Sequence, residues 1–258
     1  MIDSHCHLHY DFYDDNRDEI ITEARDCGVH TMITIGADVA SSEQAVALAS
    51  QYDCLWATVG IHPHDASTCD DRAMSRIREL AGKPRVVAIG EIGLDYYRNL
   101  SPKPAQRKAF EAQLALAAEL KLPIVIHTRE SLDDTVEIVR DFTTHLAGGV
   151  FHCFPGTPDE SFTVIEMGFV ISVGGVITYK NASMAVTAQQ TPLDKILLET
   201  DSPYLPPVPF RGEKNRPAHV RLVAEKLAEL KSQSVSEVEQ VTDRTCRKVF
   251  RLSEVFEG

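Results

Sequence analysis

Two histidines near the start of the chain, His5 and His7, stand two residues apart in the stretch Asp3-Ser4-His5-Cys6-His7. If this stretch is a β-strand, alternate side chains share a face, so both imidazoles and Asp3 point one way and Cys6 the other. Two imidazoles side by side are a suitable pair of ligands for a divalent metal ion. Two structural histidines would show the same spacing, so the metal prediction depends on partners elsewhere in the chain.

Further polar residues follow five later apolar runs, each at the point where the run ends. In chain order they are His62 with His64, Glu91, His127, His152, and Glu199 with Asp201. Alternation predicts that Val87 and Ile89 share a face with Glu91. It also pairs Val125 with His127, and Val150 with His152. Each polar residue has a structural explanation of its own, as a buried histidine, a loop acid or a turn cap. Their recurrence at equivalent positions favours one convergent site.

The predicted ligand set is larger than one metal ion needs. It consists of four histidines and two carboxylates, His5, His7, His127, His152, Glu91 and Asp201. A tetrahedral catalytic zinc takes only three protein ligands and a water. Two ions about 3.5–4 Å apart that share a carboxylate fit the donors better. We therefore predict two divalent metal cations per chain, and imidazole-rich ligation favours zinc, manganese or a similar ion over magnesium.

Strand-like apolar runs alternate with amphipathic helix-like stretches along the whole chain. Strands are predicted at residues 1–7, 31–35, 55–60, 85–90, 123–127, 149–152, 169–173 and 195–200. Helices are predicted at residues 16–27, 41–51, 71–81, 104–120, 132–142, 158–167, 182–190, 218–231 and 236–250. This alternation indicates a parallel sheet with crossover helices, and eight units in about 250 residues match an α/β fold, the (β/α)8 TIM barrel. A doubly wound open sheet is the alternative.

The barrel prediction agrees with where the polar residues fall, because active sites of such barrels lie at the C-terminal ends of the strands. No linker, internal repeat or low-complexity tract interrupts the sequence. We therefore predict a single domain, a metal-dependent hydrolase barrel over residues 1–258.

The composition restricts the kind of partner. The chain has 258 residues, of which 43% are hydrophobic, and a net charge of −12. An acidic surface repels polyanions at long range, which excludes broad binding of duplex DNA but permits a grip on a few phosphates inside a cleft. Six cysteines without a C-x-x-C pair, and no secretory signal, predict reduced thiols in a cytoplasmic protein. We expect no membrane span and no obligate protein partner.

Taken together, these stretches resemble the TatD-type metal-dependent deoxyribonucleases of the amidohydrolase superfamily. The matching stretches are DSHCHL (3–8), GIHPH (60–64), GEIGLDY (90–96), HTR (127–129), HCF (152–154), ETDSPYL (199–205), RG (211–212) and NRP (215–217). They occur in the family's order and cover nearly the whole chain. The chain is most similar to the branch of bacterial deoxyribonuclease-like paralogues.

The resemblance implies a barrel with two metal ions. It implies that the first ion is held by His5, His7, Glu91 and Asp201, and the second by Glu91, His127 and His152, with Glu91 bridging. Many amidohydrolases use a carboxylated lysine where this chain has Glu91. The resemblance also implies activity with magnesium, so the bound and the activating metal can differ. One departure from the family is Pro155, where a serine is usual, and it removes a hydroxyl and a backbone donor next to His152.

These observations lead to the hypothesis that the protein is a deoxyribonuclease, a metal-dependent phosphodiester hydrolase that degrades DNA exonucleolytically, from ends or along single strands. The candidate catalytic residues are Asp201, Glu91 and His62. Asp201 would take a proton from a metal-activated water, and His62 would donate a hydrogen bond to the phosphate or to the leaving group.

Further residues are candidates for contacts around this centre. The candidate phosphate clamps are Arg129, Arg211 and Arg216. The candidates for orienting a metal-binding histidine are Glu199 and His64. The candidates for stacking on a base are Tyr96, Phe154 and Tyr204. Surface arginines and ordinary pocket aromatics explain these residues equally well. We expect Cys6 and Cys153 to be packed thiols that face away from the site.

Two other functions are open at this point. The same centre can hydrolyse a small-molecule ester, amide or lactone, or the ester of aminoacyl-tRNA, because a fold does not determine the substrate. The protein could also bind metal without catalysis, although the complete ligand set argues against this.

Overall fold

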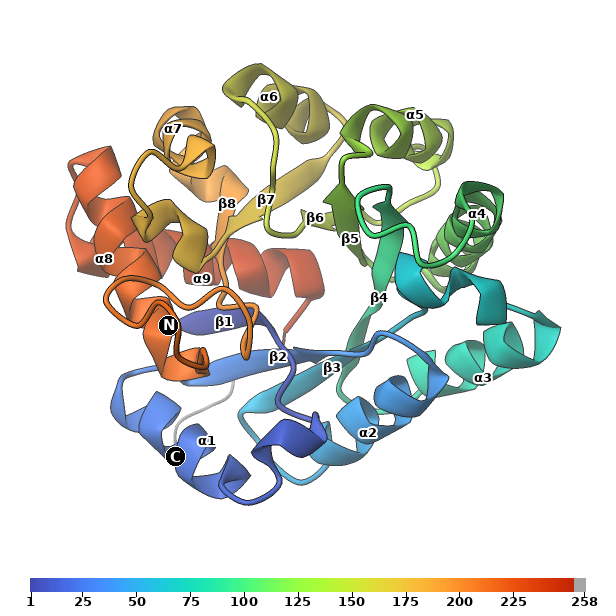
Figure 1. The fold of residues 1–258 in the computed structure, drawn as a ribbon, viewed down its shortest axis with the longest axis horizontal. Coiled ribbons are helices and arrows are strands. Elements are labelled where there is room, and N and C mark those ends of the chain that lie inside the picture. Colours follow the sequence, from blue (N-terminus) through green and yellow to red (C-terminus); the bar gives the residue numbers. More distant parts are fainter. Residues whose placement is uncertain (253–258) are drawn as a thin grey trace.

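The eight strands of the computed structural model, which describes residues 1–252, form one parallel sheet that curves into a barrel (Figure 1). The strands are β1 (Ile2–Cys6), β2 (Thr31–Ile35), β3 (Leu55–Val59), β4 (Val86–Asp95), β5 (Ile124–Arg129), β6 (Gly149–Phe151), β7 (Phe169–Val173) and β8 (Ile196–Leu198). Each strand pairs in parallel with the next along the chain. The predicted (β/α)8 TIM barrel is confirmed, and the alternative of a doubly wound open sheet is wrong.

The barrel closes between its first and last strands through a short segment that follows β8. The backbone N–H of His7 donates to the carbonyl of Ser202 at 2.8 Å, and the N–H of Asp201 donates to the carbonyl of His5, also at 2.8 Å. These two bonds make a parallel bridge between Cys6 and Ser202. The same two bonds bring Asp201 beside His5 and His7, although the two segments lie at opposite ends of the sequence.

Helices surround the barrel (Figure 1). They are α1 (Arg17–Asp26), α2 (Val39–Ala49), α3 (Asp71–Ala81), α4 (Lys103–Leu120), α5 (Leu132–Phe142), α6 (Pro158–Glu166), α7 (Ser183–Gln190), α8 (Val220–Lys231) and α9 (Val235–Phe250). Capping boxes begin two of them, Asp38 with Ser41 at α2 and Thr157 with Glu160 at α6. Among residues 1–252, no helix combines the length and apolar character that a membrane crossing requires.

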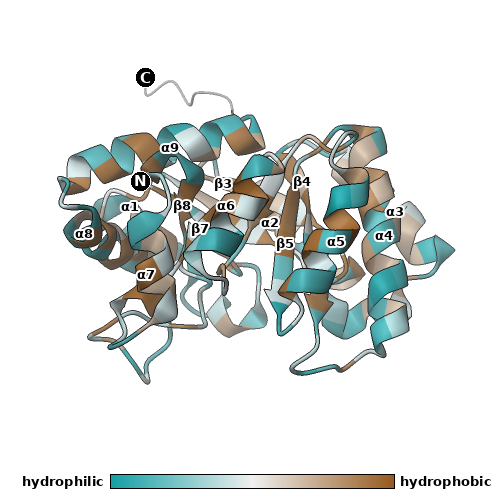
Figure 2. Cartoon of the chain, turned by 90° about the horizontal axis from the view of Figure 1, so that it is seen from above, coloured by the Kyte–Doolittle hydropathy of each residue, from teal (hydrophilic) through white to brown (hydrophobic). Residues whose placement is uncertain are grey.

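The hydrophobic core has two parts, one outside the barrel and one within it. The larger part joins the strands to the surrounding helices and includes Phe110 and Leu114 of α4. The smaller part fills the barrel interior and joins Val125 and Val150 to Phe250 of α9. Figure 2 shows α9 lying across one end of the barrel. Apolar side chains fill that end of the barrel. The polar residues lie at the opposite mouth, at the C-terminal ends of the strands.

Strand β4 differs from its prediction in length and in regularity. The sequence predicts a strand that ends at Gly90, but β4 continues to Asp95. Its register against β5 shifts between Ile89 and Ile92. Such a bulge re-aims the side chains around it. Val87 packs inside the barrel, whereas Ile89 packs in the outer core. The prediction that both share a face with Glu91 is therefore wrong.

Gly93 lies where β4 passes very close to β5. Its φ is +140°, and a Cβ atom there would lie 2.0 Å from the carbonyl oxygen of His127. We predict that Gly93→Ala lowers the free energy of unfolding by about 3 kcal/mol, because it adds both backbone strain and a steric clash. Urea unfolding followed by circular dichroism measures this loss.

Gly82→Ala is the matched control, since Gly82 has an ordinary φ of −85° and, beyond its chain neighbours, the carbonyl oxygen of Glu79, at 3.5 Å, is the nearest atom to the added Cβ. Equal stability losses in the two variants would contradict the prediction.

Candidate metal centre

The segment that closes the barrel places Asp201 beside His5, on β1, and His7, just after it. Asp201 Oδ1 lies 3.6 Å from His5 Nε2 and 3.4 Å from His7 Nε2. The second ring nitrogen of His7, Nδ1, lies 3.0 Å from the carbonyl oxygen of Ile35, so it carries the proton and donates it there. His7 Nε2 therefore presents a lone pair to the space that it shares with His5 and Asp201.

Glu91 lies at the middle of the cluster, and its two carboxylate oxygens face different groups of histidines. Oε2 lies 3.5 Å from His5 Nε2. Oε1 lies 2.9 Å from His127 Nδ1 and 2.8 Å from His152 Nε2. One carboxylate thus joins the group of His5, His7 and Asp201 to the group of His127 and His152. These six side chains are the predicted ligand set, and the structure brings all of them together.

Asp95, at the end of β4, holds the orientation of His127, and sequence reasoning missed this role. Asp95 Oδ2 lies 3.1 Å from His127 Nε2 and 3.0 Å from His64 Nε2, so it accepts a hydrogen bond from each ring. With its proton on Nε2, His127 turns the Nδ1 lone pair toward Glu91 Oε1 and the centre. A carboxylate behind a metal-binding histidine typically fixes the ring in this way. The available signal was the even, four-residue spacing from Glu91, but the sequence analysis ended the strand at Gly90 and so did not extend the alternation to Asp95.

Glu199 lies behind His152, where the sequence analysis expects a supporting carboxylate. Its Oε1 accepts a hydrogen bond from the backbone N–H of Cys153 at 2.8 Å, and its Oε2 accepts one from the hydroxyl of Ser172. His152 Nδ1 lies 3.6 Å from Glu199 Oε1, a close electrostatic contact that is too long for a hydrogen bond. Glu199 is therefore held firmly against the ring of His152.

His62 is oriented as a hydrogen-bond donor. Its Nδ1 accepts a hydrogen bond from the backbone N–H of His64 at 3.1 Å, which leaves the proton of the neutral ring on Nε2. That Nε2 lies 3.6 Å from Glu91 Oε1. Burial lowers the pKa of His62 well below its ordinary value, so the ring stays neutral. His62 thus offers an N–H, not a lone pair, to the centre.

Charge within the cluster is balanced between carboxylates and imidazoles. Burial would raise the pKa of Glu91, but His152, His62 and His127 outweigh it and hold that pKa well below its ordinary value. Burial would lower the pKa of His152, but Glu91 and Glu199 raise it well above its ordinary value. His7 and His5 likewise hold the pKa of Asp201 below its ordinary value despite burial. Both central carboxylates are therefore anionic donors.

The donors fit a divalent metal ion. The chain offers nitrogen and oxygen atoms that converge from several strands, a set that suits zinc, manganese and related ions. Both ring nitrogens of His5, and His152 Nδ1, are buried without a hydrogen-bond partner among residues 1–252. Buried polar atoms are rarely left without partners, so His5 in particular lacks the partner that a cation would supply. Asp201 and His127, with side chains 16% and 17% exposed, open the centre to solvent.

The three predicted phosphate clamps lie on the rim of the barrel and have other partners. Arg129 lies over the ring of Tyr97 at 3.9 Å, and Arg211 lies over the ring of Tyr179 at 4.4 Å. Arg216 pairs with Glu23 at 2.9 Å. None of these contacts joins an arginine to the clustered carboxylates.

The three aromatic residues predicted to stack on a base differ in their burial and in their contacts. Phe154 is fully buried and packs edge-on against Phe151, so the expectation that it stacks on a base is wrong. Tyr96 is half-buried and donates a hydrogen bond to Asp134 at 2.6 Å. Tyr204 is 53% exposed, with its ring centroid 6.0 Å from that of His7.

The two cysteines beside the ligands are set apart from the centre. Cys6 donates to the carbonyl of Ile33, and burial raises its pKa well above the ordinary value. Burial does the same for Cys153, which packs against the outer core. Both are therefore protonated thiols, as the sequence analysis expects.

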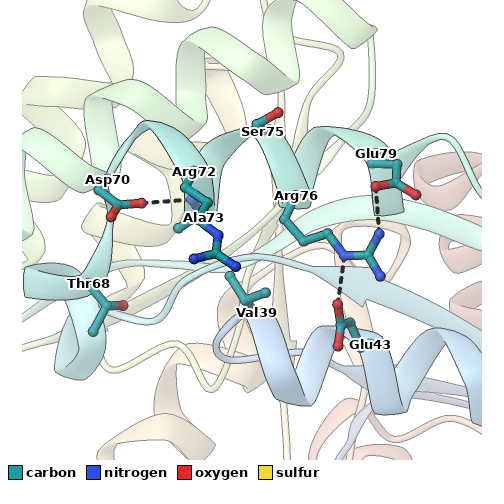
Figure 3. Close-up of a pocket in the computed structure, with 9 residues that line it drawn as sticks. All are labelled: Val39, Glu43, Thr68, Asp70, Arg72, Ala73, Ser75, Arg76 and Glu79. Carbon is teal, nitrogen blue, oxygen red and sulfur yellow. Dashed lines mark hydrogen bonds and ion pairs between the residues drawn. The ribbon is translucent and has the colours of Figure 1, made fainter.

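A roomy surface groove between α2 and α3, about 660 Å³ in volume, lies apart from this centre (Figure 3). Three of its charged groups pair with one another. Arg76 pairs with Glu43 at 2.6 Å and with Glu79 at 2.5 Å, and Asp70 caps α3 through the N–H of Ala73. None of the clustered histidines or carboxylates lines it, so the chemistry lies at the barrel mouth.

Comparison with known proteins identifies the family. The model of the family described as TatD related DNase matches residues 2–251. The chain belongs to this family. A metal-dependent hydrolase of Bacillus subtilis, YabD, is 37% identical over 98% of this chain and 100% of its own length. The 3'-5' ssDNA/RNA exonuclease TatD of Edwardsiella piscicida is 37% identical over 91% of this chain and 93% of its own.

Solved structures agree with the family assignment. The TatD homologue YJJV of Escherichia coli superposes with a TM-score of 0.91 at 29% identity, over 98% of both chains. This TatD family protein is therefore a metal-dependent hydrolase with the barrel of its relatives.

Asp95 offers a direct test of how the centre is supported. We predict that Asp95→Asn lowers the affinity for Zn²⁺ or Mn²⁺ about 10–100-fold, because His127 loses the anionic acceptor that sets its tautomer. Calorimetric titration of metal-stripped protein measures the affinity, and the thermal midpoint of the metal-free variant reports any general loss of stability. Asp134→Asn is the matched control, since Asp134 bonds Tyr96 on the rim. Equal affinities of the two variants would contradict the role of Asp95.

Proposed function

We propose that this protein hydrolyses phosphodiester bonds at the ends of single-stranded DNA through a centre that holds two divalent cations. The observation that carries the proposal is the position of Glu91, whose two oxygens face separate groups of donors at 3.5 Å and at 2.8–2.9 Å. A carboxylate in this position suits a bridge between two cations. His5, His7 and Asp201 would complete one site, and His127 and His152 the other.

Cations bound here would lower the pKa of a coordinated water and neutralise charge on the phosphoryl oxygens. The residues of the chain supply the remaining steps. Asp201 points Oδ1 at His5 and His7, which leaves Oδ2 as an acceptor for the proton of the attacking water. Its lowered pKa keeps it ready to accept that proton at neutral pH.

His62 would act on the phosphate. A neutral imidazole with its proton on Nε2 can donate to a phosphoryl oxygen without adding a positive charge to the ligand group. The bond that His64 N–H makes to His62 Nδ1 keeps the donor aimed at the centre before the substrate arrives. Preorganised donors of this kind stabilise a transition state more than donors that must first turn.

Two observations support the proposal of a single-stranded substrate. One relative is named a 3'-5' ssDNA/RNA exonuclease. The net charge of −12 disfavours the broad contact with phosphates that duplex binding needs, and an end or a single strand needs only a few such contacts. Small esters, amides and lactones are the competing substrates.

Replacement of Asp201 tests the proposal. We predict that Asp201→Asn lowers kcat for release of mononucleotides from a labelled 20-nucleotide strand by about 10²–10⁴-fold, because the general base is lost. The assay uses metal-loaded protein and the small diester bis(p-nitrophenyl) phosphate as a second substrate. Asp141→Asn, an exposed acid near the end of α5, is purified in parallel so that contaminating nuclease is measured in the same preparation.

Activity that is equal in the two variants belongs to a contaminant or to another site, and contradicts the proposal. Turnover of esters or lactones by the wild-type protein, without any turnover of the strand or the diester, would favour the competing substrates.

A further inference from the structure

The rim around the candidate metal centre is divided by charge. On the side of β5 and β6, residues 129–134 and 152–160 carry one basic residue, Arg129, against five acidic ones, Glu130, Asp133, Asp134, Asp159 and Glu160. On the side of β7 and β8, residues 174–182 and 202–216 carry four basic residues, Lys180, Arg211, Lys214 and Arg216, against Glu213 alone. In a chain of net charge −12, this is an unusual concentration of positive charge.

The loops that follow β7 and β8 interlock and form one rigid surface. Gly175 packs so tightly under the second loop that a Cβ atom there would lie 2.3 Å from the carbonyl oxygen of Leu205. The N–H of Val208 donates to Thr178 Oγ1 at 2.8 Å, and the hydroxyl of Tyr179 donates to the carbonyl of Pro206 at 2.8 Å. A surface held in this way loses little conformational entropy when it binds a ligand.

Basic side chains on this surface are available to bind an anion. Among residues 1–252, no carboxylate forms a salt bridge with Lys180, Arg211 or Lys214, whereas Arg216 is paired with Glu23. Arg211 lies over the ring of Tyr179 at 4.4 Å, and Lys214 lies 3.3 Å from the ring centroid of Phe12. Exposed cations set against aromatic rings are typical of surfaces that bind single-stranded nucleic acid, where rings stack on bases and cations follow the phosphates.

We infer that Lys180, Arg211 and Lys214, with Tyr179, form a binding surface for the body of a single-stranded polynucleotide, here called the basic rim. The inference rests on the proposed function, since it assumes that a strand end reaches the metal centre. The acidic side of the rim over β5 and β6 repels the phosphates and the basic rim attracts them, so the strand leaves the centre over β7 and β8. A strand held on one side of the centre presents its end, which favours removal of terminal nucleotides over cleavage within the chain.

The basic rim predicts that affinity depends on strand length. The full-length protein with Asp201→Asn, which degrades the probe far more slowly than the wild-type protein, is titrated with fluorescein-labelled dT12 and dT2 in magnesium, and anisotropy reports the dissociation constants. Adding Lys180→Ala and Arg211→Ala should weaken binding of dT12 about tenfold and leave dT2 within about twofold. The slope of log affinity against log salt for dT12 should fall by about 1.4, the change expected for two lost phosphate contacts.

The matched control removes two basic residues of α8, Arg221→Ala with Lys226→Ala, which pair with Glu225 and Glu229 on the same helix. It changes the net charge equally, so an equal loss of dT12 binding would assign the effect to overall charge and overturn the inference. Unchanged dT12 binding in the rim variant, or equal losses for dT12 and dT2, would also overturn it.

The proposed function has a separate readout. If the wild-type protein hydrolyses bis(p-nitrophenyl) phosphate while the rim variant binds dT12 normally, only the inference about the rim fails. If no probe of either length binds and no diester is hydrolysed, the proposed function fails as well.

Discussion

A buried carboxylate surrounded by imidazoles is the interaction on which this structure depends. The side chain of Glu91 is 5% exposed, and an ionised group taken out of water costs several kcal/mol unless it is compensated. His152 and His62, just after β6 and β3, and His127 on β5 surround it and hold its pKa down. Protonation of His152 balances part of its charge in the metal-free protein, and cations can take over that role.

Closure of the barrel and assembly of the metal centre depend on the same contacts. The backbone bonds between the segments of His5–His7 and Asp201–Ser202 close the barrel and, in the same step, complete one group of donors. At the opposite end, α9 closes the barrel with apolar side chains, so solvent and substrate reach the interior from one side only. Behind the ligands, Asp95 and Glu199 hold His127 and His152 in place. Around this centre, the rim of the barrel mouth is acidic over β5 and β6 and basic over β7 and β8.

Regular features of the fold and site could be predicted from the sequence, and irregular ones could not. Alternation on β5 and β6 correctly places His127 and His152 at one mouth, because a strand repeats every two residues. His5 and His7 reach the same mouth although the register of β1 shifts between Asp3 and Cys6. On β4 the same rule fails at a bulge, so the positions of Ile89 and Asp95 were beyond it. The burial of Phe154 and the pairing of Arg216 with Glu23 depend on contacts between distant segments, which local spacing does not encode.

The central claim is that Glu91 lies between two cations, and anomalous diffraction from crystals of the protein grown with Mn²⁺ tests it most directly. The account predicts two anomalous peaks about 3.5–4 Å apart, one beside His5, His7 and Asp201 and the other beside His127 and His152, with one oxygen of Glu91 directed at each. A single peak, or peaks that leave Glu91 out of the coordination, would contradict the account.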